Sequence, residues 1–301
     1  MLPTFSKGDS ERGMTRTEIK AILDSRGIFL TKSLGQNFLH DQNQVERIAL
    51  LADLDKSDHV LEIGPGLGPL TERLVEKVGF LRCIELDKRL IPILRERLGK
   101  WGHLELIQGD ALALLKKGQV EHPPEWKLVS NLPYSVASPI LVEACFSLEG
   151  PLSVTVTLQA EVARRIFAKP GSKDYGLLSV LLQVFYETVE MIKVPSACFF
   201  PEPNVASSCI HMNRRPGERL GIRSEKELKV FETVVKLAFS QRRKKTVNLL
   251  KQRWSAEVVR SAFDDCDLAP DIRAEKIALS DYLALTHRLS DKGGVDSESS
   301  A

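Results

Sequence analysis

A short apolar run that leads into a glycine-rich loop and then into a helical pattern constrains the fold of this chain most. Val60-Leu61-Glu62-Ile63 is typical of a buried strand, Gly64-Pro65-Gly66-Leu67-Gly68 forms the loop, and the helical pattern begins at Pro69. Glycines permit a tight turn and let a ligand approach the backbone, and the following helix N-terminus offers unsatisfied N–H groups. The G-x-G-x-G spacing of this loop departs from the dinucleotide fingerprint and disfavours pyrophosphate binding. A lone glycine loop is a weak signal, so the strands that follow decide its meaning.

Two further apolar runs end beside acidic residues. Leu81 to Leu86 contains Glu85, 21 residues beyond Gly64, and Leu104 to Ile107 is followed by Gln108-Gly109-Asp110. An acid at about that distance holds ribose hydroxyls in nucleotide sites, and ligands bind outside the carboxyl ends of parallel strands. Each acid could instead cap the helix that follows it. Strands and helices alternate from about residue 57 to 158, which predicts a mainly parallel sheet covered on both faces.

A fourth apolar run, Lys127 to Ser130, leads into Asn131-Leu132-Pro133-Tyr134. Pro133 stiffens the main chain, the Asn131 amide offers both a donor and an acceptor, and Tyr134 can stack on a flat ring. The carbonyl groups of Leu132 and Pro133 are further acceptors. This combination can hold a nucleobase, although an ordinary turn is the alternative. Four successive strand ends that each carry a suitable group favour a ligand site.

These motifs resemble those of the S-adenosylmethionine-dependent ribosomal RNA adenine dimethyltransferases, and among them the bacterial small-subunit enzymes. The resemblance covers roughly residues 16 to 290. It implies an α/β fold, a Rossmann-like class I methyltransferase domain with a smaller C-terminal helical domain. It also implies S-adenosylmethionine as the cofactor, S-adenosylhomocysteine as the product, and no metal. Further motifs that carry the resemblance are Lys32 to Leu39, Tyr175 to Val180, Val194 to Val205 and Phe239 to Lys245.

The resemblance assigns a cofactor role to several residues. Asn37 and Leu39 line the cofactor site, and Gly64 and Gly66 pass close to the methionine part of the cofactor. Glu85 is expected to hold the ribose. The remaining cofactor-site residues that it implies are Asp110, which contacts the adenine amine, and Asn131.

The resemblance also assigns the residues that handle the target adenine. The Asn131 side chain accepts a hydrogen bond from the exocyclic amine, and the carbonyl of Leu132 or Pro133 is the second acceptor. Tyr134 stacks on the target ring, and Phe199 closes its other face. The chain departs from the family pattern at Asn204 and Ala206, where a basic and an acidic residue are usual, which puts local RNA contacts in doubt.

Charge and composition suggest the domain organisation. We expect an N-terminal extension at 1–30, the methyltransferase domain at 31–213, a helical RNA-binding domain at 214–290 and a disordered tail at 291–301. Formal net charge is only +2, but residues 212–260 hold 14 Lys and Arg against 5 Asp and Glu. A solvated basic face is the alternative to RNA binding there. The residues expected to meet phosphate are Arg242, Arg243, Lys244 and Lys245.

Other features exclude several classes of protein. Five cysteines without a C-x-x-C pair and six dispersed histidines argue for a reducing cytoplasm, without a disulfide framework or a metal centre. No apolar run approaches the ~20 residues that span a membrane. The N-terminus lacks a signal pattern. The sequence shows no long heptad pattern, and we expect a monomer.

The resemblance therefore predicts an enzyme that dimethylates two adjacent adenines of small-subunit ribosomal RNA, as naked RNA or in an immature subunit. Two alternatives stay open. One is a large-subunit RNA adenine methyltransferase of the macrolide-resistance type. The other is a noncatalytic RNA-binding assembly or transcription factor on the same fold, against which the intact Glu85, Asp110 and Asn131 argue.

Overall fold

The computed structural model describes residues 14–30, 35–217 and 221–292. The described chain divides into two compact units. Unit 1 comprises residues within 1–145, 149–163 and 188–214, and unit 2 comprises residues within 146–148, 164–187 and 215–301. The start of the expected extension (1–13), three residues of the motif ahead of Gly35 (32–34) and most of the expected tail (293–301) lie outside the described residues.

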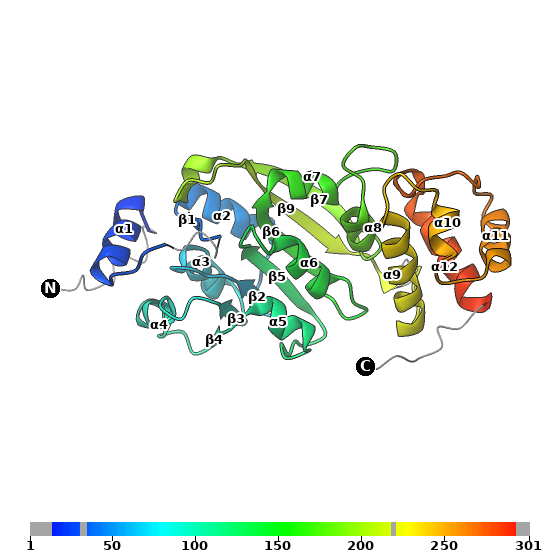
Figure 1. Cartoon of the computed structure of the whole chain (residues 1–301). Helices are drawn as coiled ribbons and strands as arrows, with labels where there is room; N and C mark the ends of the chain where they lie inside the picture. Colours follow the sequence, from blue (N-terminus) through cyan, green and yellow to red (C-terminus); the bar gives the residue numbers. More distant parts are fainter. Residues whose placement is uncertain (1–13, 31–34, 218–220, 293–301) are drawn as a thin grey trace. The chain divides into compact units, whose positions relative to one another are not determined.

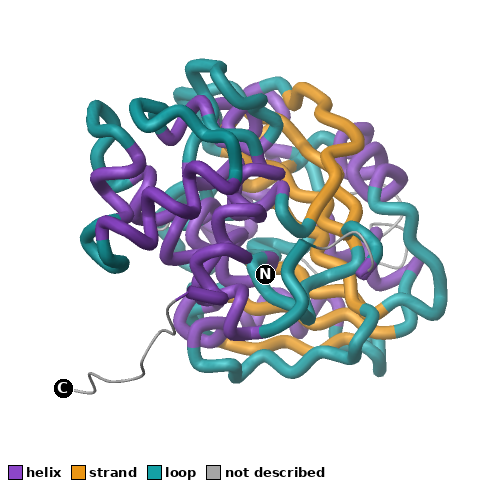
Figure 2. The backbone as a smooth tube through the Cα atoms, turned by 90° about the vertical axis from the view of Figure 1, so that its right-hand side faces the viewer, coloured by secondary structure: helices purple, strands orange, loops and turns teal. Residues whose placement is uncertain are grey.

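Unit 1 is built on a seven-stranded sheet whose strands Figure 2 shows in orange as one twisted band. From β4 to β6 all neighbouring strands pair in parallel, and β9 pairs antiparallel with β6. The four strands predicted at the start of the sheet appear with bounds shifted by one residue. The strands, in spatial order, are β4 (Leu104–Gln108), β3 (Phe80–Glu85), β2 (His59–Ile63), β5 (Trp126–Asn131), β6 (Ser153–Gln159), β9 (Ser207–Arg214) and β7 (Tyr186–Val194).

The strand order reverses between β2 and β5. The chain passes from β2 outward to β3 and β4, returns to β5 beside β2, and continues in the opposite direction to β6. In open α/β sheets a ligand crevice forms outside the carboxyl ends of the strands at such a switch point. The glycine loop after β2 and Asn131 at the end of β5 therefore flank the place where a ligand is expected.

Helices cover both faces of the sheet, which confirms the predicted α/β class (Figure 1). On one face α2 (Gln42–Leu51) packs against α3 (Pro69–Lys77), and on the other α5 (Ala111–Lys116) packs against α6 (Ala137–Cys145). Helix α4 (Ile91–Leu98) packs beside β4. The core under α2 and α3 is apolar and fully buried, with Val45, Ile48, Leu74, Leu81 and Val129 among its members. Burial of such side chains is the main favourable term in folding.

Two short segments complete unit 1. Strand β1 (Phe38–Leu39) pairs antiparallel with β8 (Phe199–Phe200), which follows the short 3-10 helix η2 (Ser196–Cys198). Helix α1 (Arg16–Ser25) begins with a capping box between Thr15 and Glu18. Its buried face forms a cluster that includes Ile19, Phe38, Leu67 and Leu90. The described part of the expected N-terminal extension is therefore an ordered helix packed on this unit.

Unit 2 is mainly helical. Its helices are α8 (Leu177–Gln183), α9 (Glu225–Phe239), α10 (Thr246–Leu250), α11 (Ala256–Asp265), the 3-10 helix η4 (Ala274–Lys276) and α12 (Leu279–Lys292), and α7 (Ala160–Ile166) ends in it. The apolar face of α9 and the side chains of Phe263 and Tyr282 form its buried core. The unit takes in residues 164–187, which the sequence placed in the methyltransferase domain. Helix α12 also includes residues 291 and 292 of the expected tail.

Candidate active site

A cavity lies at the carboxyl ends of β2, β3, β4 and β5 in unit 1, and it encloses about 1040 Å³ of empty space with its open mouth included. Segments far apart in sequence line it together. The sequence-predicted site residues among the lining are Asn37, Leu39, Gly64, Gly66, Glu85, Asp110, Asn131, Leu132, Pro133 and Tyr134. Hydrogen bonds from Gly64 N to Ile84 O and from Gly109 N to Glu85 O, both 2.9 Å, join neighbouring strand ends at this edge.

The glycine loop is confined on two sides. Gly66 has φ +63°, a conformation that side chains rarely adopt, and a Cβ there would lie 2.8 Å from two carbons of the Phe38 ring. A Cβ on Gly64, with φ +72°, would lie 3.3 Å from Pro133. The loop therefore requires glycine both for its backbone and for its close neighbours. Both glycines line the cavity, where a ligand can approach their backbone.

Glu85 ties the loop to the end of β3. Its Oε2 accepts a hydrogen bond from Gly66 N at 3.0 Å, and its Oε1 accepts one from Asp87 N at 2.8 Å. The side chain is 6% exposed, and burial raises the pKa of this carboxyl. Each carboxylate oxygen has two acceptor positions, so both can still receive a ligand hydroxyl. Glu85 can hold a ribose and the loop at once.

Asp110 caps a helix and also lies in the cavity wall. It is the N-cap of α5, where its Oδ1 accepts hydrogen bonds from Leu112 N at 2.9 Å and Ala113 N at 3.2 Å. It also lines the cavity. Capping therefore fixes the side chain at the cavity wall and does not compete with contact to a ligand.

Asn131 presents a buried acceptor to the cavity. Its Nδ2 donates a hydrogen bond to the backbone carbonyl of Asn37 at 3.0 Å. Its Oδ1 is buried and has no hydrogen-bond partner among the described residues. An unsatisfied buried acceptor costs about 1–3 kcal/mol, and native structures seldom keep one without a reason. A donor from a bound molecule would satisfy this atom.

The remainder of the tetrapeptide is also held in place. Leu132 N donates to Thr157 O at 3.1 Å, and the Pro133 carbonyl accepts from Val136 N at 3.1 Å. The Tyr134 hydroxyl hydrogen-bonds with Ser207 Oγ at 2.5 Å. Burial raises the pKa of this phenol. The ring of Tyr134 is therefore anchored at its tip and remains in the cavity wall.

Phe199 occupies a different position from the other residues predicted for the target base. Its side chain is 2% exposed, and it is not among the residues that line the cavity. Its ring meets that of Tyr134 edge to face, with centroids 6.4 Å apart and an interplanar angle of 71°. In this structure Phe199 supports the Tyr134 ring from behind.

Three polar residues line the cavity that the predicted site did not include: Gln36, Glu62 and Ser135. Glu62 on β2 is 1% exposed, burial raises its pKa to about 7, and Cys83 Sγ donates to its Oε2 at 3.4 Å. Gln36 donates from Nε2 to Asp87 Oδ2 at 2.9 Å. The signal for Glu62 was present in the sequence, as an acid within an apolar strand two residues before the first glycine.

The four residues predicted for RNA contact belong to unit 2. Arg242, Arg243, Lys244 and Lys245 are exposed in the turn between α9 and α10, and Arg242 Nη2 donates to the Lys173 carbonyl at 3.4 Å. Throughout the described ranges no group of three or more His, Cys, Asp or Glu side chains is arranged to hold a metal ion. None of the helices described is long and apolar enough to cross a membrane.

Comparisons with known proteins identify the family of this chain. Residues 29–291 match the family model for ribosomal RNA adenine dimethylase. Ribosomal RNA small subunit methyltransferase A of Clostridium botulinum is 38% identical over 273 residues, which are 90% of this chain and 98% of that protein. The enzyme of the same name from Ligilactobacillus salivarius is 36% identical and covers 92% of this chain and 96% of its own.

Solved structures show the same architecture. The 23S rRNA methyltransferase ErmE superposes with a TM-score of 0.62 at 28% identity, over 84% of this chain and all of that one. A dimethyladenosine transferase from Plasmodium falciparum has the same fold, with a TM-score of 0.70 at 20% identity over 85% and 98% of the two chains. The predicted class I fold and the dependence on S-adenosylmethionine are confirmed. The chain belongs to the ribosomal RNA adenine dimethylase family.

Proposed function

We propose that this chain transfers methyl groups from S-adenosylmethionine to the exocyclic amines of two adjacent adenines in small-subunit ribosomal RNA, giving N6,N6-dimethyladenosine during ribosome biogenesis. Its family consists of ribosomal RNA adenine dimethylases, and the relatives that are 35–38% identical are named for the small subunit. The observation that carries the proposal is the buried, unpartnered Oδ1 of Asn131 at the cavity edge.

The cavity fits the cofactor by the chemistry of its walls. The bare backbone at Gly64 and Gly66 admits the methionine part, Glu85 accepts the ribose hydroxyls, and Asp110 accepts from the adenine amine. Asn37 and Leu39 close the N-terminal side. When bound, S-adenosylmethionine supplies an activated methyl group on a sulfonium.

The tetrapeptide orients the amine of the target base. Asn131 Oδ1 accepts one amine hydrogen, and the carbonyl of Leu132 or Pro133 is the second acceptor, since the one bond that Pro133 accepts from Val136 N leaves its second lone pair available. Two acceptors held out of the ring plane favour a more tetrahedral nitrogen whose lone pair points at the methyl donor. Positioning of this kind supplies much of the acceleration without a metal or a covalent nucleophile.

Aromatic side chains receive the base itself. Tyr134, fixed by Ser207, stacks on the adenine, which must be unpaired or extruded from its helix to reach the cavity. The role assigned to Phe199, which is to close the other face of the ring, stays a prediction, since this residue is buried behind Tyr134.

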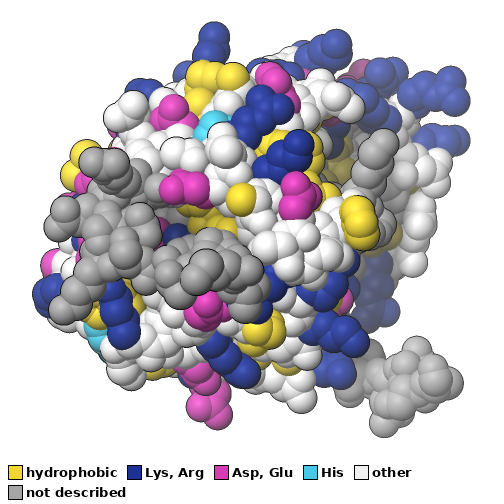
Figure 3. Space-filling model, turned by 90° about the vertical axis from the view of Figure 1, so that its left-hand side faces the viewer, with side chains coloured by type: hydrophobic (Ala, Val, Ile, Leu, Met, Phe, Trp, Pro, Cys, Tyr) yellow, Lys and Arg dark blue, Asp and Glu magenta, His cyan; other side chains and the backbone are white. Residues whose placement is uncertain are grey.

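The substrate is held through its phosphates by the turn between α9 and α10. On the face drawn in Figure 3, basic and acidic side chains are interspersed. By contrast, residues 212–260 carry a strong local excess of Lys and Arg, and residues 242–245 are all exposed. We place the reaction in the cytoplasm, in line with five free cysteines, and expect a monomer that acts on small-subunit RNA or an immature subunit.

The two alternatives receive less support. ErmE, which acts on 23S RNA, is 28% identical, below the relatives named for the small subunit. A noncatalytic factor would have no need of the unpartnered acceptor at Asn131. The test is to incubate the chain and S-adenosylmethionine with immature small subunits, naked small-subunit RNA and large-subunit RNA, and to map modified bases at single-nucleotide resolution. Two adjacent dimethylated adenines in small-subunit RNA are expected. Modification of large-subunit RNA alone would contradict the proposal.

A further inference from the structure

The end of the glycine loop lacks the usual support of a helix N-terminus. Gly68 is the N-cap of α3 and has no side chain to accept a backbone N–H, and Pro69 follows it. Ser, Thr, Asp and Asn commonly fill this position and fix the start of the helix. No side chain at the N-cap fixes the loop here, so contacts from elsewhere in the fold can determine its position.

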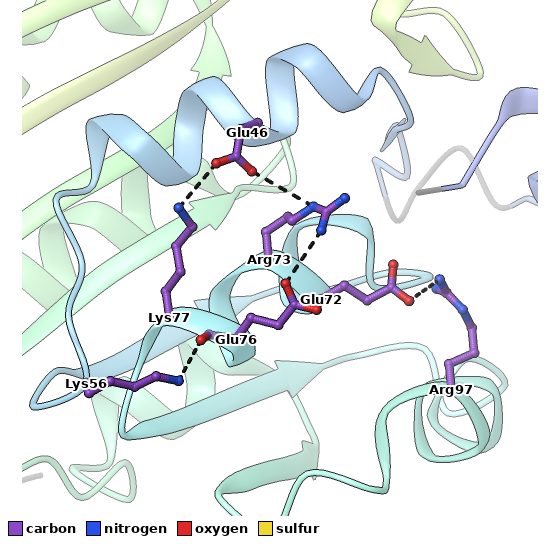
Figure 4. A network of polar contacts seen from close by, with 7 residues as sticks. All are labelled: Glu46, Lys56, Glu72, Arg73, Glu76, Lys77 and Arg97. Atoms are coloured by element: carbon purple, nitrogen blue, oxygen red, sulfur yellow. Dashed lines mark hydrogen bonds and ion pairs between the residues drawn. The ribbon is translucent and has the colours of Figure 1, made fainter. Parts of the chain in front are cut away.

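Arg97, near the end of α4, makes those contacts. Its Nη1 donates to the Leu67 carbonyl in the loop, and its Nη2 lies 2.6 Å from Glu72 Oε1 in the first turn of α3. Figure 4 shows the Arg97 side chain extending from α4 toward Glu72. The side chains are 7% and 12% exposed, and burial lowers the pKa of Arg97 and raises that of Glu72. A planar guanidinium can bind two acceptors in a fixed geometry, which a lysine ammonium does not reproduce.

Apolar packing against α4 also restricts the position of Leu67 and Gly68 at the end of the glycine loop. Leu67 is fully buried, and a Cβ on Gly68 would lie 3.1 Å from both Leu94 and Leu98 of α4. At the other end of the loop, Gly66 N is held by Glu85. Small displacements at Leu67 and Gly68 are therefore transmitted to the glycines that line the cavity, because close-packed interiors transmit strain.

We propose that Arg97 is a positioning residue for the cofactor: by bridging the Leu67 carbonyl and Glu72, it fixes the glycine loop and thereby sets the affinity for S-adenosylmethionine. It acts through the loop and does not line the cavity. The inference rests on the proposed function, because it takes Gly64 and Gly66 as cofactor contacts.

The opposite side of α3 offers a matched control. There Arg73 lies 3.5 Å from Glu76 and 3.9 Å from Glu46, and Lys77 lies 3.2 Å from Glu46 (Figure 4). The four side chains of this network, those of Glu46, Arg73, Glu76 and Lys77, are 22–44% exposed. Exposed ion pairs of this kind contribute little, and none of them contacts the glycine loop. Arg73→Gln removes an arginine from the same region without touching the Leu67 carbonyl.

The experiment compares Arg97→Gln, Arg97→Lys and Arg73→Gln in the full chain. Calorimetric titration with S-adenosylmethionine gives its Kd, and methyl transfer to small-subunit RNA gives kcat and the KM for the cofactor. Hydrogen exchange of a peptide spanning residues 64–72 reports on the loop. Arg97→Gln is expected to raise the cofactor Kd and KM about tenfold. Because Arg97 touches no reacting atom, kcat at saturating cofactor should change less than about twofold.

The lysine variant keeps the positive charge and guards against a glutamine variant that fails to fold. It should raise Kd by a smaller factor, and exchange at 64–72 should be faster in both Arg97 variants than in Arg73→Gln. If folded Arg97→Lys and Arg97→Gln bind the cofactor as the unchanged chain does, the inference is wrong. If the unchanged chain itself fails to bind S-adenosylmethionine, the proposed function fails instead.

Discussion

The cavity edge of unit 1 and the basic turn of unit 2 are organised in opposite ways. At the cavity edge, buried side chains and backbone groups are joined by hydrogen bonds from five separate segments, and glycines stand where no side chain fits. The basic turn consists of exposed, long side chains between two helices. Chemistry at a single amine needs fixed atoms, whereas attraction to phosphate needs only charge near a surface. A single substitution should therefore have a large effect on activity at the cavity edge and a small effect in the basic turn.

The largest effect is expected from Asn131→Ala. It removes the buried acceptor for the target amine, and kcat should fall about 10²- to 10³-fold, the cost of losing one preorganised hydrogen bond at a reacting group. Methyl incorporation into small-subunit RNA measures this loss. The control is the Kd for S-adenosylmethionine in the same protein, which should remain within a few-fold. Full activity would remove Asn131 from its assigned role.

The next effect concerns the stability of the protein without its cofactor. Burial raises the pKa of Glu62 to about 7, above its ordinary value of 4.5. Between these values the folded state binds the proton more tightly than the unfolded state. The contribution of Glu62 to stability is therefore full below about pH 4.5 and is lost as pH rises toward 7.

Glu62→Gln removes this pH dependence. From pH 4.5 to pH 7.5, the free energy of unfolding of Glu62→Gln should rise by about 3 kcal/mol relative to that of the unchanged chain. Urea unfolding at both pH values gives the comparison, and the difference between the two proteins isolates Glu62 from the other carboxyls. A difference that does not change with pH would show that this buried carboxyl titrates near its ordinary value.

A smaller effect is expected from Gly66→Ala, which should weaken the binding of S-adenosylmethionine at the cavity edge. Alanine is strained at φ +63°, and its Cβ meets the Phe38 ring, so we expect a rise of about tenfold in the Kd for S-adenosylmethionine. Gly118→Ala is the matched control, because Gly118 has φ +61° but no atom within 4 Å of its Cβ position. An equal effect of the two substitutions would mean that backbone strain alone, rather than the crowded loop, determines the result.

The smallest effect is expected in the basic turn. The double change Arg242→Gln, Arg243→Gln should weaken RNA binding and reduce the slope of log K against log salt by about 1 to 2, with little change in kcat at saturating RNA. Arg260→Gln on α11 is the control for a lost exposed arginine in the same unit. A large fall in kcat for the double variant would break the contrast between the two regions.

The sequence was informative where local signals are strong. Apolar runs, glycines and acids mark β2 to β5 to within one residue, and the order of these strands brings together Gly66, Glu85, Asp110 and Asn131. The resemblance supplied the family, which the comparisons confirm. Roles for individual residues stay predictions.

Long-range packing could not be read in the same way. The pairing of β1 with β8, which buries Phe199 behind Tyr134, joins two-residue strands from distant parts of the chain. The bond from Arg97 to the Leu67 carbonyl likewise has no local pattern. The acid- and serine-rich composition after residue 290 suggested disorder, yet helix α12 continues to Lys292.

The hydrogen bond from Asn131 Nδ2 to the Asn37 carbonyl bears on which purine the site accepts. The Asn131 amino group donates to the Asn37 backbone carbonyl. A flip of the Asn131 amide would therefore place its oxygen against the carbonyl oxygen, which is unfavourable. The face that meets the incoming base is therefore always an acceptor. Adenine offers an amino group at that position, whereas guanine and hypoxanthine offer an oxygen, which the amide would repel. Under the proposed role of Asn131, we therefore expect this one backbone carbonyl to give the site a preference for adenine before methyl transfer begins.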